Sequence, residues 1–354
     1  MNYEYESPLM SRALVFVVDC ILLCVSSARS VPRLDFPSVK LHFELHILSR
    51  SISKALAQLN LRAVLFLYSS EFPLFRHQPQ DSSAISPIMS IDLGLKDVHV
   101  LITGAAGGIG LETVHTFRQL GSRVTAHYNS NIGDLGSLTD VVSIKADVRD
   151  EAGVQKLLDD AAKKNGGPVS ILVVNHGIWP TNDAPIADMD LNQWSNTLAV
   201  NLTGPFLLCR AYLQALRSAP NSTKDTASII FIGSTAGKFG EAGHGDYAAT
   251  KSALMYGLTP TLKNEIVRIA PKGRVNSVNP GWVATPMATE TLKDTAFVER
   301  AISTTPLQKV ARPEDVARQV AVIASPVLSG HVSGTNIMVD GGMEGRLLFP
   351  PGSA

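Results

Sequence analysis

The sequence has little charge and few cysteines. Only 18% of its 354 residues are charged, and 31 basic residues balance 31 acidic ones. Nucleic-acid binding by phosphate neutralisation needs a basic excess, so this balance argues against a nucleic-acid partner. The three cysteines, Cys20, Cys24 and Cys209, cannot form a disulfide framework, and they indicate no oxidising compartment. Apolar residues make up 45% of the chain, which supplies a core and excludes disorder over the whole length.

Residues 1–88 differ from the rest and contain no motif that carries chemistry. Their apolar run Ala13–Val25 is shorter than the ~20 residues of a membrane-spanning helix, and Asp19 lies at its centre. The small residues 26–28 suit a signal-peptide cleavage site, but the residues before the run are not clearly basic. We therefore predict a poorly ordered or non-native extension that ends before Met89. A signal or membrane-associating segment and a small domain remain alternatives.

From residue 89 on, short apolar segments alternate with amphipathic ones. Most of the apolar segments are rich in valine and isoleucine, as strands buried on both faces of a parallel sheet are. The pattern predicts an α/β fold, a doubly wound parallel sheet (Rossmann-like) in a single main domain over 89–343, with a C-terminal tail at 344–354. The predicted strands are Val98–Thr103, Val124–Tyr128, Val141–Ala146, Val169–Asn175, Ser228–Ile232, Arg274–Val278 and Asn336–Val339. The predicted helices are Leu111–Leu120, Ala152–Lys164, Leu191–Ser218, Tyr247–Ile269 and Pro313–Ala324.

A glycine-rich turn follows the first predicted strand. Gly104, Gly108 and Gly110 lie between that strand and the helix that begins at Leu111. Such a turn lets the backbone approach a pyrophosphate, which binds at the helix N-terminus. The spacing is Gly-x3-Gly-x-Gly rather than the commoner Gly-x-Gly-x-x-Gly, and an ordinary turn is the alternative. The strand–turn–helix context favours a dinucleotide site.

A tyrosine and a lysine lie four residues apart on one predicted helix. Tyr247 and Lys251 therefore share a helix face. A phenol is a poor base at neutral pH, but a nearby cation lowers its pKa, and it can then exchange a proton with a carbonyl or an alcohol. The pair alone is common on solvated helices. Ser234 ends a buried strand, at the edge where open α/β sheets form their sites, so it is placed to bond the reacting oxygen.

Residues 103–110, Thr-Gly-Ala-Ala-Gly-Gly-Ile-Gly, resemble the cofactor motif of the short-chain dehydrogenase/reductase family, and the resemblance extends over 93–343. It implies an NAD(P)-dependent oxidoreductase acting on CH–OH groups. In that family the matching residues give Ser234 the role of orienting substrate, Tyr247 that of acid and base, and Lys251 that of binding the nicotinamide ribose. Asn201 matches a fourth member, which holds a water in a proton relay.

The resemblance also implies cofactor contacts at other positions. Asp147 matches an acid that contacts adenine, and Thr285 matches a residue that bonds the nicotinamide carboxamide. After the fourth strand, Val174 and His176 depart from the family's pattern, and we expect His176 to be structural. No metal site is expected. The implied cofactor-binding residues are Gly104, Gly108, Ile109, Gly110, Tyr128, Asn129, Ser130, Asp147, Val148, Asn175, Gly177, Tyr247, Lys251, Pro280, Gly281, Val283 and Thr285.

The end of the second predicted strand distinguishes the two nicotinamide cofactors. An acid there binds the ribose 2′-OH and repels a 2′-phosphate. The segment 128–130 has no carboxylate, its Asn129 and Ser130 can donate to a phosphate, and a protonated His127 would add charge. NADP(H) is therefore favoured. NAD(H) is the alternative, because an arginine is missing there and the stretch before Asp147 is too short for a full helix.

The sequence indicates less about the substrate than about the cofactor. An aromatic and apolar lining suits a nonpolar ketone or secondary alcohol, while a small sugar or acyl substrate stays open. We expect an NADP(H)-dependent enzyme that interconverts a ketone and a secondary alcohol; a non-catalytic cofactor-binding protein is the alternative. The resemblance implies a homo-oligomer, a dimer or tetramer, and we expect a cytoplasmic location without a membrane partner. The candidate pocket residues are Trp179, Pro180, Phe239, His244 and 282–287, with 286–305 as a mobile lid.

Overall fold

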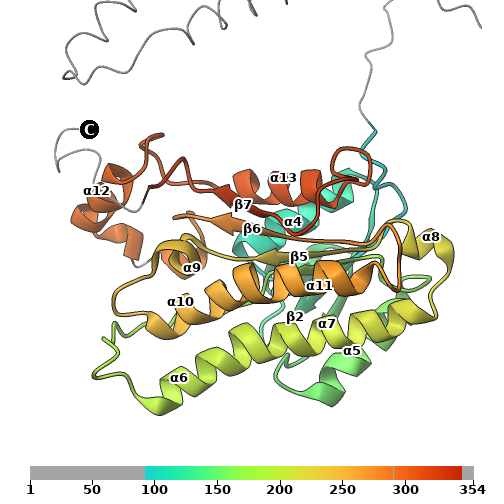
Figure 1. Cartoon of the computed structure of the whole chain (residues 1–354), viewed down its shortest axis with the longest axis horizontal. Coiled ribbons are helices and arrows are strands. Elements are labelled where there is room, and N and C mark those ends of the chain that lie inside the picture. The colour runs from blue at the N-terminus through green and yellow to red at the C-terminus, as the bar shows by residue number, and fades with distance from the viewer. Residues whose placement is uncertain (1–91, 290, 345–354) are drawn as a thin grey trace, which may run out of the picture. The chain divides into compact units, whose positions relative to one another are not determined.

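The structure, a computed structural model, describes residues 92–289 and 291–344. Within these residues seven parallel strands form one sheet in the order β3-β2-β1-β4-β5-β6-β7 (Figure 1). The predicted doubly wound sheet is thus confirmed. Strands β1 to β3 extend the sheet to one side and β4 to β7 extend it to the other, so the strand order reverses between β1 and β4, where such sheets form their binding crevice. The strands are β1 His99–Ile102, β2 Arg123–Tyr128, β3 Val142–Lys145, β4 Ile171–Val174, β5 Ser228–Ile232, β6 Arg274–Pro280 and β7 Asn336–Val339.

Helices cover both faces of the sheet. On one face α4 packs against α13, and on the other α5 packs against α7, with α11 lying on β6 (Figure 1). Two apolar layers result, one on each side of the fully buried strands β1, β4 and β5. The helices are α4 Gly108–Gln119, α5 Glu151–Lys164, α6 Leu191–Leu198, α7 Gly204–Arg217, α8 Asn221–Lys224, α9 Thr235–Phe239, α10 Gly245–Ser252, α11 Thr259–Ile266, α12 Thr295–Ser303 and α13 Pro313–Ala324.

Two helices that the sequence predicts as continuous contain π-helical turns. Residues Ala199–Thr203 separate α6 from α7, and Ala253–Leu258 separate α10 from α11. A π-turn inserts a residue without ending the apolar face, so hydrophobic spacing does not reveal it. Between β2 and β3 the chain forms only the 3-10 turn Gly133–Ser137, as expected from the shortness of that stretch.

A buried arginine ties β6 to the C-terminus of α13. The Arg274 guanidinium donates to the carbonyls of Ile323, Ala324 and Ser329 at 2.5, 2.7 and 3.1 Å. The Ile323 and Ala324 carbonyls lie at the end of α13, where the helix offers no further N–H donors and where its dipole favours a cation. The contact holds α13 against the sheet end that leads to β7.

No helix in 92–289 or 291–344 is long and apolar enough to cross a membrane. The run Ala13–Val25 lies outside the described residues, as do the rest of 1–88 and residues 345–354 of the tail. The domain boundaries at 88 and 343 stay predictions.

The buried His99 on β1 makes the stability depend on pH. Its Nδ1 donates to the Gly167 carbonyl at 2.8 Å, and its Nε2 accepts from the Thr125 hydroxyl at 2.8 Å. This arrangement is that of a neutral ring, and burial lowers the pKa of His99 from 6.5 to about 4. Between pH 6.5 and about 4, His99 is protonated in the unfolded state but stays neutral in the folded state.

We therefore expect the free energy of unfolding to be highest above pH 6.5 and to fall toward pH 4. His99 alone contributes up to about 1.4 kcal/mol per pH unit in that window. Urea unfolding of the full chain and of His99→Gln, followed from pH 7.5 downward, checks this. The variant keeps a donor and an acceptor but does not titrate, so its stability should fall less steeply. Parallel curves for the two proteins would show that His99 contributes nothing to the pH dependence.

Candidate active site

A cavity of about 540 Å³ opens at the carboxyl ends of the strands. It runs from the loop after β1, past the ends of β4, β5 and β6, to α10. Gly110, Tyr128, Ser130 and Asn201 are not part of its wall. The predicted site residues that line it are Gly104, Gly108, Ile109, Asn129, Asp147, Val148, Asn175, Gly177, Ser234, Tyr247, Lys251, Pro280, Gly281, Val283 and Thr285.

The loop between β1 and α4 requires glycine. Gly104 and Gly108 have φ of +61° and +53°, a region that favours glycine over residues with a Cβ. Gly110 lies beneath the loop, and a Cβ there would collide with the Gly104 carbonyl oxygen. The side-chain amide of Asn175 holds the loop in place by donating to the carbonyls of Thr103 and Gly104 at 2.9 and 3.0 Å.

The N-terminus of α4 faces this loop and fits a cofactor pyrophosphate. Gly107 at the N-cap makes no capping bond, and the first turn contains no acid. A Cβ added at Gly107 would meet no atom within 4 Å, so the backbone borders open space there. The first amides of the helix can therefore bind an anion directly.

Ser234 and Tyr247 meet in the cavity. Ser234 follows β5, and its Oγ accepts from the Ala236 amide at 3.1 Å, which caps α9. Its side chain also forms a hydrogen bond with Tyr247. Burial raises the pKa of Tyr247 to about 12, the Glu241 carboxylate adds to that rise, and the Ser234 bond opposes it. The phenol therefore holds its proton at neutral pH.

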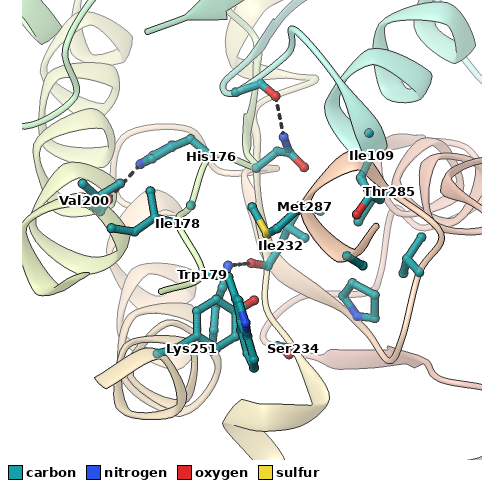
Figure 2. Close-up of a pocket in the computed structure, with 18 of the residues that line it drawn as sticks. Ile109, His176, Ile178, Trp179, Val200, Ile232, Ser234, Lys251, Thr285 and Met287 are labelled. Atoms are coloured by element: carbon teal, nitrogen blue, oxygen red, sulfur yellow. Dashed lines mark hydrogen bonds between the residues drawn. The ribbon is translucent and has the colours of Figure 1, made fainter. Parts of the chain in front are cut away.

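Lys251 faces the same cavity from one helical turn beyond Tyr247. Its Nζ donates to the Ile232 carbonyl at 2.8 Å (Figure 2). The same Nζ lies 5.5 Å from the centre of the Tyr247 ring. Burial lowers the pKa of Lys251 to about 8. The expectation of a lowered pKa for Tyr247 is wrong for this structure, because burial of the phenol raises that pKa and prevails.

Asn201 lies in the π-turn between α6 and α7 and is buried. Its Oδ1 accepts from the Ile178 amide at 2.8 Å, and its Nδ2 donates to the Ile178 carbonyl at 2.9 Å. The side chain thus holds the backbone that follows β4, beside Gly177 on the cavity wall. Both of its polar atoms are used, and its implied role in a water relay stays a prediction.

The other end of the cavity carries a paired acid. The Arg149 guanidinium binds both oxygens of Asp147, with the closest contact at 2.7 Å, and holds the pKa of that carboxyl at about 2. His127 does not supply charge here. It is buried between the Gly104 amide and the Ala146 carbonyl, and burial lowers its pKa, so the charge that a protonated His127 would add is absent at neutral pH.

Only some of the predicted pocket residues reach the cavity. Trp179, Trp282 and residues 285–287 line it, whereas Pro180, Phe239 and His244 do not. Trp179 packs on the wall in Figure 2, with its ring 3.7 Å from that of His244 and 4.7 Å from that of Tyr247, measured between centroids. Residues 286–305 form two short 3-10 turns and α12, with residue 290 outside the description. Their mobility as a lid stays a prediction.

Three charged residues in or beside the cavity were not predicted. Glu241 and Arg149 line the cavity. Asp246 is fully buried, and its carboxylate accepts from the Thr197 hydroxyl, the Gln193 amide and the backbone of Tyr247. Its place in the first turn of α10, directly before the tyrosine, was the available signal, since an acid is favourable there.

The family model described as Enoyl-(Acyl carrier protein) reductase matches residues 104–344. The chain belongs to the short-chain dehydrogenase/reductase family. As a member of it, this protein is an NAD(P)-dependent oxidoreductase that acts on hydroxyl or keto groups of small molecules. The glycine loop, the uncapped N-terminus of α4 and the adjoining cavity fit such a nicotinamide dinucleotide.

Its relatives within the short-chain dehydrogenase/reductase family include a 3-oxoacyl-(acyl-carrier-protein) reductase of Thermotoga maritima, 34% identical over 69% of this chain and 96% of that protein. A human (3R)-3-hydroxyacyl-CoA dehydrogenase is 34% identical over 70% of this chain and 96% of its own length. Among solved structures, the short-chain dehydrogenase/reductase titled glucose/ribitol dehydrogenase from Brucella melitensis is 31% identical, with a TM-score of 0.64 over 72% of this chain and 99% of that chain.

We expect Asp246→Ala to destabilise the enzyme by about 1–3 kcal/mol, because it leaves the buried Thr197 hydroxyl and the Gln193 amide without their acceptor. The free energy of unfolding in urea measures this. Asp188→Ala, which removes an exposed carboxylate, serves as the control and should change stability by less than about 0.5 kcal/mol. Equal stabilities of the two variants would contradict the role given to Asp246.

Proposed function

We propose that this enzyme interconverts a ketone and a secondary alcohol with NADP(H), and that Tyr247 transfers the proton. The observation that carries the proposal is the meeting of Ser234, Tyr247 and Lys251 in a cavity that continues into the glycine loop. Gly104, Gly108 and the first turn of α4 would hold the pyrophosphate. When bound, the nicotinamide supplies or accepts the hydride.

In the direction of reduction, the Tyr247 hydroxyl gives its proton to the carbonyl oxygen of the substrate, and the Ser234 hydroxyl bonds to the same oxygen. The raised pKa of Tyr247 keeps it protonated at neutral pH, which suits it to this role. In the direction of oxidation, the deprotonated phenol takes the proton from the alcohol. The Lys251 ammonium, beside the ring, stabilises that negative charge. Asn201 would orient the cavity wall and complete a proton relay.

Tyr247→Phe tests the proton transfer. We expect kcat for a panel of small ketones to fall by about 10²–10⁴-fold, because the general acid is lost. Cofactor binding, followed by thermal stabilisation, should persist, since the ring still packs against Trp179. Tyr256→Phe, at an exposed tyrosine of the second π-turn, is the matched control and should keep its activity. Wild-type turnover by Tyr247→Phe would exclude the mechanism.

The preference for NADP(H) rests on the end of β2. Tyr128, Asn129 and Ser130 contain no carboxylate, and Asn129 reaches the cavity wall. The strand register sets the cation Lys145 of β3 beside Tyr128. The nearest acid that lines this end, Asp147, is neutralised by Arg149. A 2′-phosphate would thus meet donors and a cation, not an unpaired negative charge.

Tyr128→Asp tests the cofactor preference. We expect NADP to stabilise the wild type more than NAD does, with a ligand at a hundred times its dissociation constant adding ~2.7 kcal/mol. The new carboxylate should weaken NADP binding by about tenfold or more and strengthen NAD binding, because it repels a 2′-phosphate and accepts from a 2′-OH. Tyr128→Phe controls for the loss of the hydroxyl. Preference of the wild type for NAD would favour the alternative NAD(H) enzyme.

A homo-oligomer is part of the proposal. The described surface exposes Leu191, Phe206, Tyr256 and Val267, large apolar side chains on or beside the helices α6, α7 and α11. Exposed apolar side chains on neighbouring helices favour an interface between subunits.

A further inference from the structure

An unpaired carboxylate lies in the cavity beside the reacting phenol. Glu241 comes from the loop between α9 and α10, is half-buried and lines the same wall as Tyr247 and Trp179. Within the described part of the chain its carboxylate makes no hydrogen bond or ion pair. A carboxylate partly withdrawn from water without a donor loses some of its hydration, and a bound molecule with a donor would compensate for that loss.

The groups around Glu241 do not supply that donor. Burial raises the pKa of Glu241, and the negative charge of Asp183 adds to that rise. The neighbouring cations are engaged elsewhere, because Lys251 donates to Ile232 and the Lys238 ammonium lies over the Phe239 ring, 4.7 Å from its centroid. None of these described groups donates to the Glu241 carboxylate.

The loop that carries Glu241 is held in place. The Ala184 amide donates to the Gly243 carbonyl at 2.9 Å, and His244 pairs through Nε2 with Asp183 at 2.8 Å. The second ring nitrogen of His244, Nδ1, is buried and has no hydrogen-bond partner within the described residues. Trp179 stacks on His244 and contacts Tyr247, which links this loop to the reacting residue. Glu241 is thus presented at a set place relative to the phenol.

We propose that Glu241 selects the substrate: it binds a hydrogen-bond donor, a hydroxyl or an ammonium, on the part of the substrate remote from the reacting carbon, and it disfavours substrates with a carboxylate there. This inference rests on the proposed function, because it concerns the same cavity and the same Tyr247. The aromatic walls Trp179 and Trp282 fit the carbon skeleton between the two groups.

Four ketones on one ring test the selection: cyclohexanone and its 4-hydroxy, 4-amino and 4-carboxylate derivatives. For the wild-type full chain we expect kcat/KM to be about tenfold higher for the hydroxyl and ammonium compounds than for cyclohexanone, and about tenfold lower for the carboxylate, since charge-assisted hydrogen bonds are the strong ones. The ratio of ammonium to hydroxyl tells which donor the site prefers. A wild type that prefers the carboxylate would overturn the inference without any variant.

Glu241→Gln separates charge from hydrogen bonding. The amide keeps an acceptor, so the advantage of the hydroxyl compound should remain, while the advantage of the ammonium and the discrimination against the carboxylate should each shrink by about tenfold. Glu241→Leu should remove all three effects. Glu265→Gln, at an exposed carboxylate of α11, is the matched control and should keep the wild-type ranking.

The pH profile gives a second readout. The charge of Glu241 raises the pKa of Tyr247, so Glu241→Gln should shift the profile of alcohol oxidation to lower pH, and Glu265→Gln should not. If wild type and Glu241→Gln reduce all four ketones with the same ranking and the same profile, the inference is wrong and the proposed function stands. If the folded protein binds NADP but reduces none of them, the proposed function itself is wrong, and the inference falls with it.

Discussion

A chain of hydrogen bonds through the buried side chains of Thr103 and His176 joins the ends of β1 and β4. Burial lowers the pKa of His176 to about 3, so its ring is neutral and has one donor. Its Nε2 donates to the Val200 carbonyl at 3.2 Å, so its Nδ1 must accept from the Thr103 hydroxyl at 2.8 Å. The Thr103 hydroxyl in turn accepts from the backbone amide of Asn175. The glycine loop, the floor of the cavity and the π-turn that carries Asn201 are therefore one hydrogen-bonded unit. If one link were removed, the other groups would remain buried without partners.

Burial acts in opposite directions on the two central ionisable groups of the site. It raises the pKa of Tyr247 and lowers that of Lys251, because in each case it disfavours the charged form. The site thereby favours the neutral phenol, which can donate a proton to a ketone. The Ser234 hydrogen bond acts against burial and lowers the pKa of the phenol. Burial of the phenol and the charge of Glu241 thus act together to keep Tyr247 protonated at neutral pH.

The sequence predicted the strands closely, because valine- and isoleucine-rich runs between turn residues leave little choice; Ser228–Ile232 and Asn336–Val339 have the predicted bounds. The sequence also predicted that Tyr247 and Lys251 lie on one helix face, because this follows from their spacing of four residues alone. What it missed depends on contacts between distant segments. The burial of Asp246 against Thr197 and the neutral state of His127 need the packed fold. α4 begins at Gly108 instead of Leu111, because the loop geometry overrides the poor helix propensity of glycine.

Trp179 makes the substrate wall and the reacting phenol parts of one packed cluster. Its indole contacts the rings of His244, Tyr247 and Trp282, with centroids 3.7, 4.7 and 6.1 Å away. In a close-packed cluster a side chain cannot change shape without displacing its neighbours. Substitutions that reshape this wall for another substrate must therefore also displace Tyr247, the proton donor of the proposed mechanism. If Tyr247 transfers the proton as proposed, specificity and rate are physically coupled, since proton transfer depends on hydrogen-bond distance and direction.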